Sequence, residues 1–66
     1  MKRFESDRYY RPADTEMRLI ATEGTLAIWR HEGRGPTYQK IGRRIWYFGR
    51  ELNAFIDEQR VEPTAA

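Results

Sequence analysis

The stretch Thr25–Tyr47, TLAIWRHEGRGPTYQKIGRRIWY, decides the fold of this chain of 66 residues. It starts with a helical pattern, is interrupted by the Gly-Pro pair at 35–36, and continues as two short aromatic and β-branched runs around the Gly-Arg pair at 42–43. Residues 30–50, which extend just beyond this stretch, carry six basic side chains and one acidic one, with apolar residues between them. A basic ribbon beside a short helix is typical of contact with a polyanion, most plausibly duplex DNA.

The length and composition limit the chain to one small domain. A domain of this size buries only about 60% of the surface of its unfolded chain, so we expect modest stability. The chain has no Cys and a single His, which excludes disulfides and cysteine zinc sites. No apolar run approaches the roughly 18 residues of a membrane span, and the N-terminus lacks a secretory signal pattern. We therefore expect a cytoplasmic protein with no membrane partner, no metal and no cofactor.

The net charge of +2 is unevenly distributed along the chain. Residues 1–29 have equal numbers of acidic and basic groups, residues 30–50 have an excess of five basic groups, and residues 51–66 have an excess of three acidic groups. A concentrated basic patch attracts phosphate, whereas diffuse positive charge would only favour solubility.

The N-terminal third predicts a tail followed by a helix. Residues 1–9 are charged and aperiodic, and we expect a flexible tail there. Tyr10–Ala21 is the first helix candidate, with Pro12 at its first position and acidic residues in its first turn. Its apolar stripe comprises Ala13, Met17 and Ile20, with Leu19 beside it.

A second helix is predicted over Glu23–Glu32. Thr22 is a suitable N-cap and Gly33 a suitable left-handed residue after the last turn. Leu26 and Trp29 share the face expected to pack on the core. The tight connection at positions 21–22 makes the two helices a helix-turn-helix candidate.

The remaining residues predict a hairpin and a third helix. The strands are Thr37–Ile41 and Arg44–Phe48, and alternation places Ile45 and Tyr47 on one face, opposite Trp46. The third helix runs from Gly49 to about Arg60, with Leu52, Phe55, Ile56 and Gln59 on its apolar face. Residues 61–66 are expected to be a C-terminal tail.

The predicted fold class is α+β, mainly helical: a winged helix-turn-helix over residues 10–60, in the order helix, helix, β-hairpin wing, helix. In such a domain one helix enters the major groove while the wing reaches phosphates or the minor groove.

Several motifs in this order resemble a known family. They are Thr25-Leu26, Trp29, Glu32-Gly33, Gly35-Pro36-Thr37, Lys40-Ile41-Gly42-Arg43-Arg44, Tyr47 and Glu51-Leu52-Asn53-Ala54-Phe55-Ile56. The run is similar to the small winged-helix domain of phage excisionases (recombination directionality factors) and of AlpA-type regulators, relatives of the MerR DNA-binding domain. The similarity covers residues 10–58. It departs from the family pattern at Arg11, where a capping Thr is usual, and at Ile20, where a small Gly is common.

The resemblance implies a non-enzymatic, architectural DNA-binding protein of a bacterial host cell, associated with the nucleoid. Excisionases bind repeated sites near a phage attachment site, often cooperatively, bend the DNA and direct a separate integrase toward prophage excision. Other members regulate transcription, and the sequence does not separate these functions. A third hypothesis, from a different class, is a protein-interaction module that uses Ile28, Trp46 and the acidic last helix.

The candidate DNA-binding residues fall into two sets. Those of the recognition helix are Thr22, Glu23, Gly24, Thr25, Ala27, Ile28, Arg30 and His31. Those of the wing and its flank are Arg34, Lys40, Arg43 and Arg44. Contact with DNA at Arg43 and Arg44 is favoured because Lys40 and Arg34 lie close in the chain with no acidic residue nearby. The sequence leaves three alternatives for Trp46. It covers DNA backbone, packs against a neighbouring protomer, or lies under the third helix. No nucleophile–base pair or phosphate-binding loop is present in the sequence, so no catalytic residue is expected.

Overall fold

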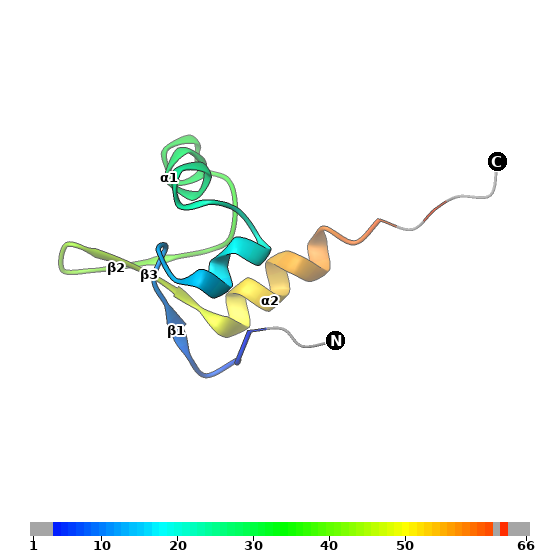
Figure 1. Cartoon of the computed structure of the whole chain (residues 1–66), viewed down its shortest axis with the longest axis horizontal. Coiled ribbons are helices and arrows are strands. Elements are labelled where there is room, and N and C mark those ends of the chain that lie inside the picture. The colour runs from blue at the N-terminus through cyan, green and yellow to red at the C-terminus, as the bar shows by residue number, and fades with distance from the viewer. Residues whose placement is uncertain (1–3, 62, 64–66) are drawn as a thin grey trace.

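The computed structural model describes residues 4–61 and residue 63. Over these residues it contains two α-helices, a 3-10 helix and a three-stranded antiparallel sheet, shown in Figure 1. The elements in chain order are β1 (Tyr9–Tyr10), η1 (Thr15–Leu19), α1 (Glu23–Glu32), β2 (Gln39–Ile41), β3 (Arg44–Phe48) and α2 (Gly49–Glu58). The predicted α+β class is confirmed.

The sheet has the strand order β1-β3-β2, so β3 is its central strand. The register pairs Tyr10 with Tyr47 and Ile41 with Arg44, which leaves a two-residue turn at the hairpin tip. Gly42 in this turn has a φ of 64°, as expected for a tight hairpin turn. The predicted bounds of the return strand are confirmed, whereas the outgoing strand begins at Gln39 rather than at Thr37.

The core takes side chains from the N-terminal segment and from every helix and strand except β2. Its buried members are Phe4, Tyr10, Met17, Leu26, Tyr47 and Leu52. The inner face of the sheet, formed by Tyr10, Lys40, Ile45 and Tyr47, supplies two of them because side chains alternate between faces along a strand. The predicted core orientation of Ile45 and Tyr47 is confirmed: Tyr47 is fully buried and Ile45 packs against the core.

Helix α1 has the predicted bounds because local capping fixes both ends. The Thr22 hydroxyl accepts a hydrogen bond from the backbone N–H of Thr25 at 3.2 Å. Gly33 follows the last turn with a φ of 74°, which a residue without a Cβ adopts at little cost. Leu26 is fully buried and Trp29 packs against the core, as predicted.

The prediction of a helix over Tyr10–Ala21 was wrong. Tyr10 belongs to β1, and helical structure in this region is limited to the five residues of η1. The reason is a local turn: the Asp14 carboxylate accepts a hydrogen bond from the backbone N–H of Arg11 at 2.9 Å. An aspartate that bonds nearby backbone in this way competes with helix formation. Of the expected stripe, Met17 is fully buried but Ala13 and Leu19 are exposed.

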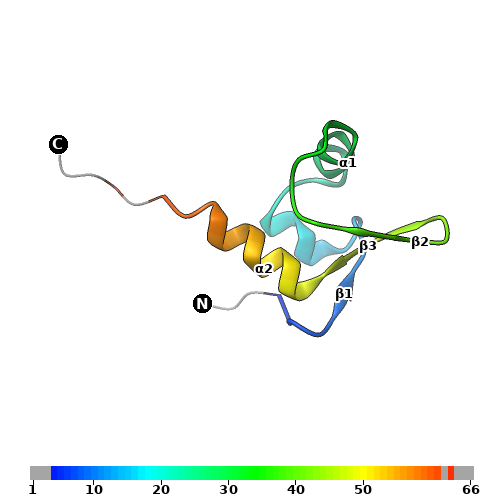
Figure 2. The same ribbon diagram turned by 180° about the vertical axis from the view of Figure 1, so that it is seen from behind.

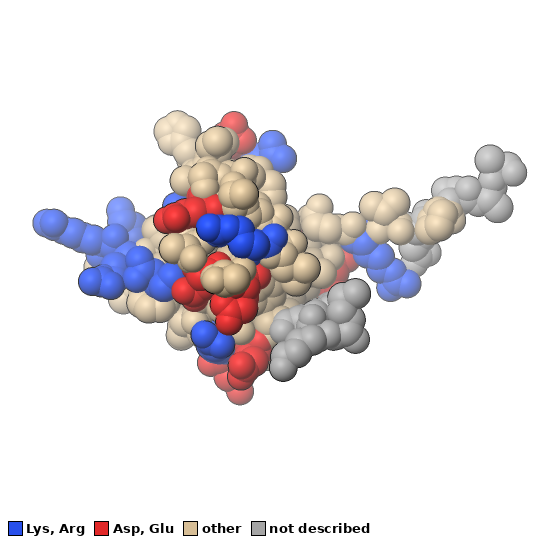
Figure 3. Space-filling view, viewed as in Figure 1, with Lys and Arg blue, Asp and Glu red and all other residues tan. Residues whose placement is uncertain are grey.

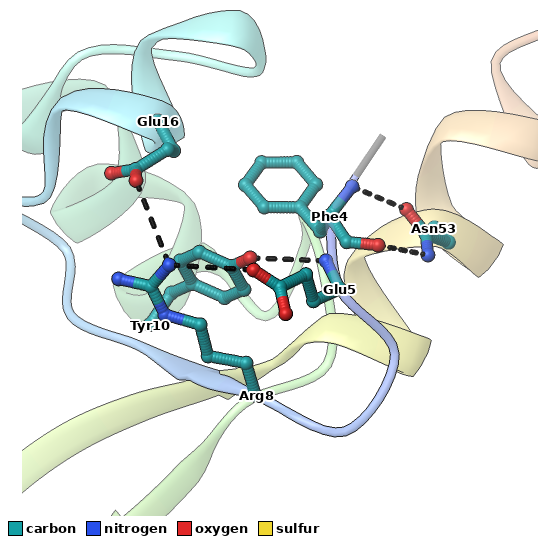
Figure 4. A network of polar contacts seen from close by, with 6 residues as sticks. All are labelled: Phe4, Glu5, Arg8, Tyr10, Glu16 and Asn53. Carbon is teal, nitrogen blue, oxygen red and sulfur yellow. Dashed lines mark hydrogen bonds and ion pairs between the residues drawn. The ribbon is translucent and has the colours of Figure 1, made fainter. Parts of the chain in front are cut away.

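The expected flexible tail over residues 1–9 is also corrected for residues 4–9, while residues 1–3 lie outside the described part. Phe4 is buried, and its backbone N–H and C=O form two hydrogen bonds with the Asn53 side chain of α2, at 3.1 and 2.9 Å (Figure 4). Gly49, the first residue of α2, packs so closely on this segment that an added Cβ would overlap the Glu5 carbonyl. The segment is therefore an integral part of the fold.

Three further contacts hold the same segment in place (Figure 4). The Tyr10 hydroxyl accepts a hydrogen bond from the backbone N–H of Glu5 at 3.0 Å. Arg8 lies 3.8 Å from the carboxylates of both Glu5 and Glu16. Two of the charges that suggested a solvated tail, Glu5 and Arg8, thus pair with each other at the surface of the fold.

Helix α2 ends two residues earlier than expected, at Glu58. Leu52 is fully buried, Phe55 and Ile56 are half-buried, and Gln59 is exposed beyond the helix end. Val61 is exposed, while residues 62 and 64–66 of the expected C-terminal tail lie outside the described part. Within that described part, neither helix has the length and apolarity needed to cross a membrane.

We predict that Asn53→Ala lowers the free energy of unfolding by about 1–3 kcal/mol, since it removes two part-buried hydrogen bonds to the Phe4 backbone. Urea denaturation measures the change. Glu58→Ala, an exposed position on the same helix, is the control and should change stability by less than about 0.5 kcal/mol. Equal stability of both variants would show that residues 4–9 do not fold with the rest.

Candidate nucleic-acid interface

The β2–β3 hairpin and α1 lie on the same side of the molecule. In Figures 1 and 2 the hairpin projects from the body as an arm, α1 lies beside its base, and α2 extends in the opposite direction. A hydrogen bond between Arg30 of α1 and Tyr47 of β3 confirms that the two elements are in contact. An extended ligand would therefore meet the helix and the hairpin together.

The tip of the hairpin is the most basic part of the described surface in Figure 3, and no acidic side chain covers it in that view. Lys40, Arg43 and Arg44 are all exposed there. The register puts Lys40 beside Ile45 on the inner face and Arg44 beside Ile41 on the opposite face. Within residues 4–61 and 63, none of these three side chains forms an ion pair. The tip therefore presents unneutralised positive charge on both faces of the ribbon.

Helix α1 presents one uninterrupted exposed face, which we term the reading face: Gly24, Ala27, Ile28 and His31. These positions are spaced i, i+3, i+4, i+7 and therefore lie on one side of a helix. All four are exposed, and Ile28 retains 57% of its accessible surface. The structure thus brings together half of the residues predicted for the recognition helix, as a small and apolar surface.

The N-terminal residues of α1 have different surroundings. Glu23 is exposed in the first turn. The Thr22 hydroxyl donates to that of Thr25 at 3.1 Å while it caps the helix, so these two residues shape the helix end. These two side chains therefore shape the start of the helix in the candidate interface more than they supply free hydrogen-bond donors.

Arg30 lies at the edge of the reading face, one helical turn after Ala27, and its side chain is directed toward β3. Its guanidinium donates a hydrogen bond to the buried Tyr47 hydroxyl at 2.8 Å and lies 5.9 and 6.0 Å from the ring centres of Tyr38 and Tyr47. The sequence suggested that Arg30 reaches phosphate or a guanine edge. In the structure it has an internal partner instead, which leaves the reading face without an arginine.

Arg34 also has neighbours that the sequence interpretation overlooked. Its guanidinium lies 3.6 Å from the Glu32 carboxylate and 5.7 Å from the ring centre of Trp29. The statement that no acidic residue lies near the basic side chains around Arg43 and Arg44 therefore does not hold at Arg34. Because both partners of the ion pair are exposed, the pair contributes less than about 1 kcal/mol, and a phosphate would compete with Glu32 for Arg34.

The outer face of the sheet carries an aromatic cluster that sequence reasoning missed. Tyr9 packs against Phe48 with ring centres 4.8 Å apart and against Trp46 at 6.2 Å. The Arg11 guanidinium covers the Trp46 ring at 4.8 Å. Trp46 thus packs within the chain against residues from and beside β1, an arrangement that none of its three predicted roles included. The only available signal was the Tyr9-Tyr10 pair, in a segment interpreted as tail and helix.

A shallow groove runs along α2 and the loop before β2. It is lined by Gly35, Pro36, Thr37, Glu51, Ala54, Phe55 and Glu58. Its two carboxylates would repel phosphate, so it does not extend the basic interface. The described residues contain no group of three or more His, Cys, Asp or Glu side chains arranged to hold a metal ion.

Comparison with known protein families, with curated proteins and with solved structures finds no match to this chain. The functional interpretation therefore rests on the residues and their geometry.

Gly24 has no conformational or packing role within the chain. Its φ is not positive, and a Cβ at this position would have no neighbour within 4 Å. We predict that Gly24→Ala raises the free energy of unfolding by about 0.5–1 kcal/mol through helix propensity. Gly33→Ala is the matched comparison, and it should lower stability by roughly 1 kcal/mol because its φ is 74°. Thermal unfolding of both variants measures the difference, and destabilisation by Gly24→Ala would reveal an unrecognised packing role.

Proposed function

We propose that this chain binds duplex DNA as a winged helix-turn-helix protein. In this proposal η1 and α1 form the helix-turn-helix, α1 lies in the major groove, and the β2–β3 hairpin is the wing. The observation that carries the proposal is that α1, which has an exposed face, and a hairpin with an unneutralised basic tip lie on one side of the molecule. This is the pairing of a base-reading element with a backbone-contacting element that DNA-binding domains require.

The distribution of charge around the hairpin tip fits a groove of DNA. A ribbon that enters the minor groove meets phosphates on both sides, since the groove is only about 6 Å wide. Lys40 and Arg44 lie on opposite faces of the ribbon and Arg43 lies at its turn. Each wall of the groove would therefore face a cation, an arrangement that one-sided basic patches do not provide.

The reading face supports modest base specificity. Ala27 and Ile28 are suited to apolar contact with thymine methyl groups, and Glu23 is suited to accept a hydrogen bond from a cytosine amine. Gly24 would allow the helix to approach the base edges closely. With Arg30 bonded to Tyr47, this face lacks a bidentate guanine reader. DNA shape and deformability would therefore supply much of the selection.

Within this class, we propose an architectural accessory factor for site-specific recombination, similar to a phage excisionase. The motif order from Thr25 to Ile56 supports this assignment. Because one small domain contacts few base pairs, selective binding would require several copies on repeated sites, with self-association or cooperative binding along the DNA. The partner would be an integrase. The bent complex of this chain with DNA would direct that integrase toward excision.

Excision by an integrase tests the biological role. A plasmid that carries attachment sites with tandem repeats is incubated with its integrase, with and without this chain. The proposal expects product only when the chain is added, together with a retarded and bent complex in a gel assay. Duplex binding without any effect on recombination would favour a transcription regulator, and absence of duplex binding would favour the protein-interaction hypothesis.

The wing predicts a defined salt dependence. Four to six phosphate contacts give a slope of log K against log salt of roughly −4 to −5. We predict that the double variant Arg43→Ala/Arg44→Ala reduces the magnitude of this slope by about 2, because two phosphate contacts are lost. Fluorescence anisotropy with a labelled duplex at several salt concentrations measures both slopes.

The control for the wing variant removes the same charge from outside the hairpin. Arg8→Ala/Arg50→Ala changes the net charge equally but should leave the slope unchanged within error. If both double variants change the slope to the same extent, net charge rather than the wing determines DNA binding.

Gly24→Ala also tests the reading face. The added methyl group should weaken binding to a duplex selected by the wild-type chain, even though it stabilises the fold. Competition binding against an unselected duplex separates this loss from a general effect. Unchanged binding of the selected duplex would place the bases away from Gly24.

A further inference from the structure

Within the described residues, one side-chain hydrogen bond joins α1 to β3, the second strand of the hairpin. It runs from the Arg30 Nη1 to the Tyr47 hydroxyl, at 2.8 Å. Arg30 belongs to the recognition candidate α1, and Tyr47 belongs to the central strand β3. The bond therefore spans the two elements that the proposed function assigns to the two grooves of DNA.

The surroundings of this bond make it costly to break. Tyr47 is fully buried in the folded chain, so its hydroxyl is paired with Arg30 rather than with solvent. A buried polar group that loses its partner is destabilised more than an exposed one. The Arg30 guanidinium is also placed near the rings of Tyr38 and Tyr47, which restrict where it can move.

The other inward contacts of α1 are apolar. Leu26 is part of the core, and Trp29 packs against Phe55 with ring centres 5.9 Å apart. Apolar contacts hold α1 against the body but depend weakly on direction. A hydrogen bond weakens steeply as its angle departs from linear. The Arg30–Tyr47 bond is thus the contact best suited to fix the rotation of α1 relative to β3.

We propose that Arg30 is a positioning residue: it sets the angle between α1 and the β2–β3 hairpin, and it does not contact DNA. The effect on DNA binding rests on the proposed function, whereas the effect on the angle does not. The reading face and the hairpin tip are separate contact points on a rigid duplex. A change in the angle between α1 and the hairpin weakens binding because the two contact points no longer fit the duplex together. It removes no phosphate contact.

The first test measures the angle in the free protein. Residual dipolar couplings of the α1 and β3 amides give the relative orientation of the two elements by NMR. Tyr47→Phe removes only the hydroxyl that accepts from Arg30, and Arg30→Met keeps the aliphatic stem. Both variants should show a changed or averaged orientation of α1. The matched control is Tyr10→Phe, which removes a buried hydroxyl bonded to Glu5 rather than to α1 and should leave the orientation unchanged.

The second test measures binding to a duplex selected from a random pool by the wild-type chain. Tyr47→Phe and Arg30→Met should each raise Kd by about tenfold, and the double variant by no more than either alone, since they remove the same interaction. The salt slope should stay at the wild-type value in all three variants. Tyr10→Phe should lose stability without this change in Kd.

Two results would overturn the inference. One is an unchanged α1 orientation in Tyr47→Phe, and the other is a salt slope reduced by about 1 in Arg30→Met, which would indicate a direct phosphate contact. If the wild-type chain binds no duplex, the proposed function fails, while the orientation measured in the free protein still decides the role of Arg30.

Discussion

The burial of Tyr47 is the constraint on which the rest of the structure depends. This residue lies on the central strand, has no exposed surface, and pairs across the sheet with Tyr10. Its ring belongs to the core shared by both helices, and its hydroxyl accepts the hydrogen bond from Arg30. A buried tyrosine of this kind fixes the strand register because a slip by one residue would expose the ring and separate the hydroxyl from its donor. The position of α1 and the direction of the wing follow from the same residue.

Features with local causes could be predicted from the sequence. The bounds of α1 follow from the Thr22 cap and from Gly33, and the bounds of β3 follow from period-two alternation next to a two-residue turn. The exposed wing tip was equally predictable, because Lys40, Arg43 and Arg44 fall at or next to a turn that projects away from any core. Within the candidate site, local sequence patterns were sufficient to predict the positions of the side chains that point to solvent.

Features with non-local causes could not be predicted. Residues 4–9 have the composition of a solvated tail, and their place in the fold depends on Asn53, which lies 49 positions after Phe4. A separation of 17 positions likewise concealed the Arg30–Tyr47 hydrogen bond, so Arg30 was assigned to DNA by its charge alone. Asp14 shows the limit of periodicity as a guide, because one side-chain hydrogen bond to Arg11 replaced a predicted helical turn. In each case a polar interaction determined the local structure, and the pattern of apolar residues in the sequence does not reveal such interactions.

The central claim is that α1 and the wing form one DNA-binding surface. Its most direct test is a titration of the isotope-labelled chain with duplex DNA, followed residue by residue through its NMR amide shifts. We predict that the largest shifts fall on Gly24, Ala27, Ile28 and His31 of α1 and on residues 40–44 of the wing, with little change along Ala54–Glu58 of α2. Shifts confined to the α2 groove, or no shifts at low salt, would contradict it.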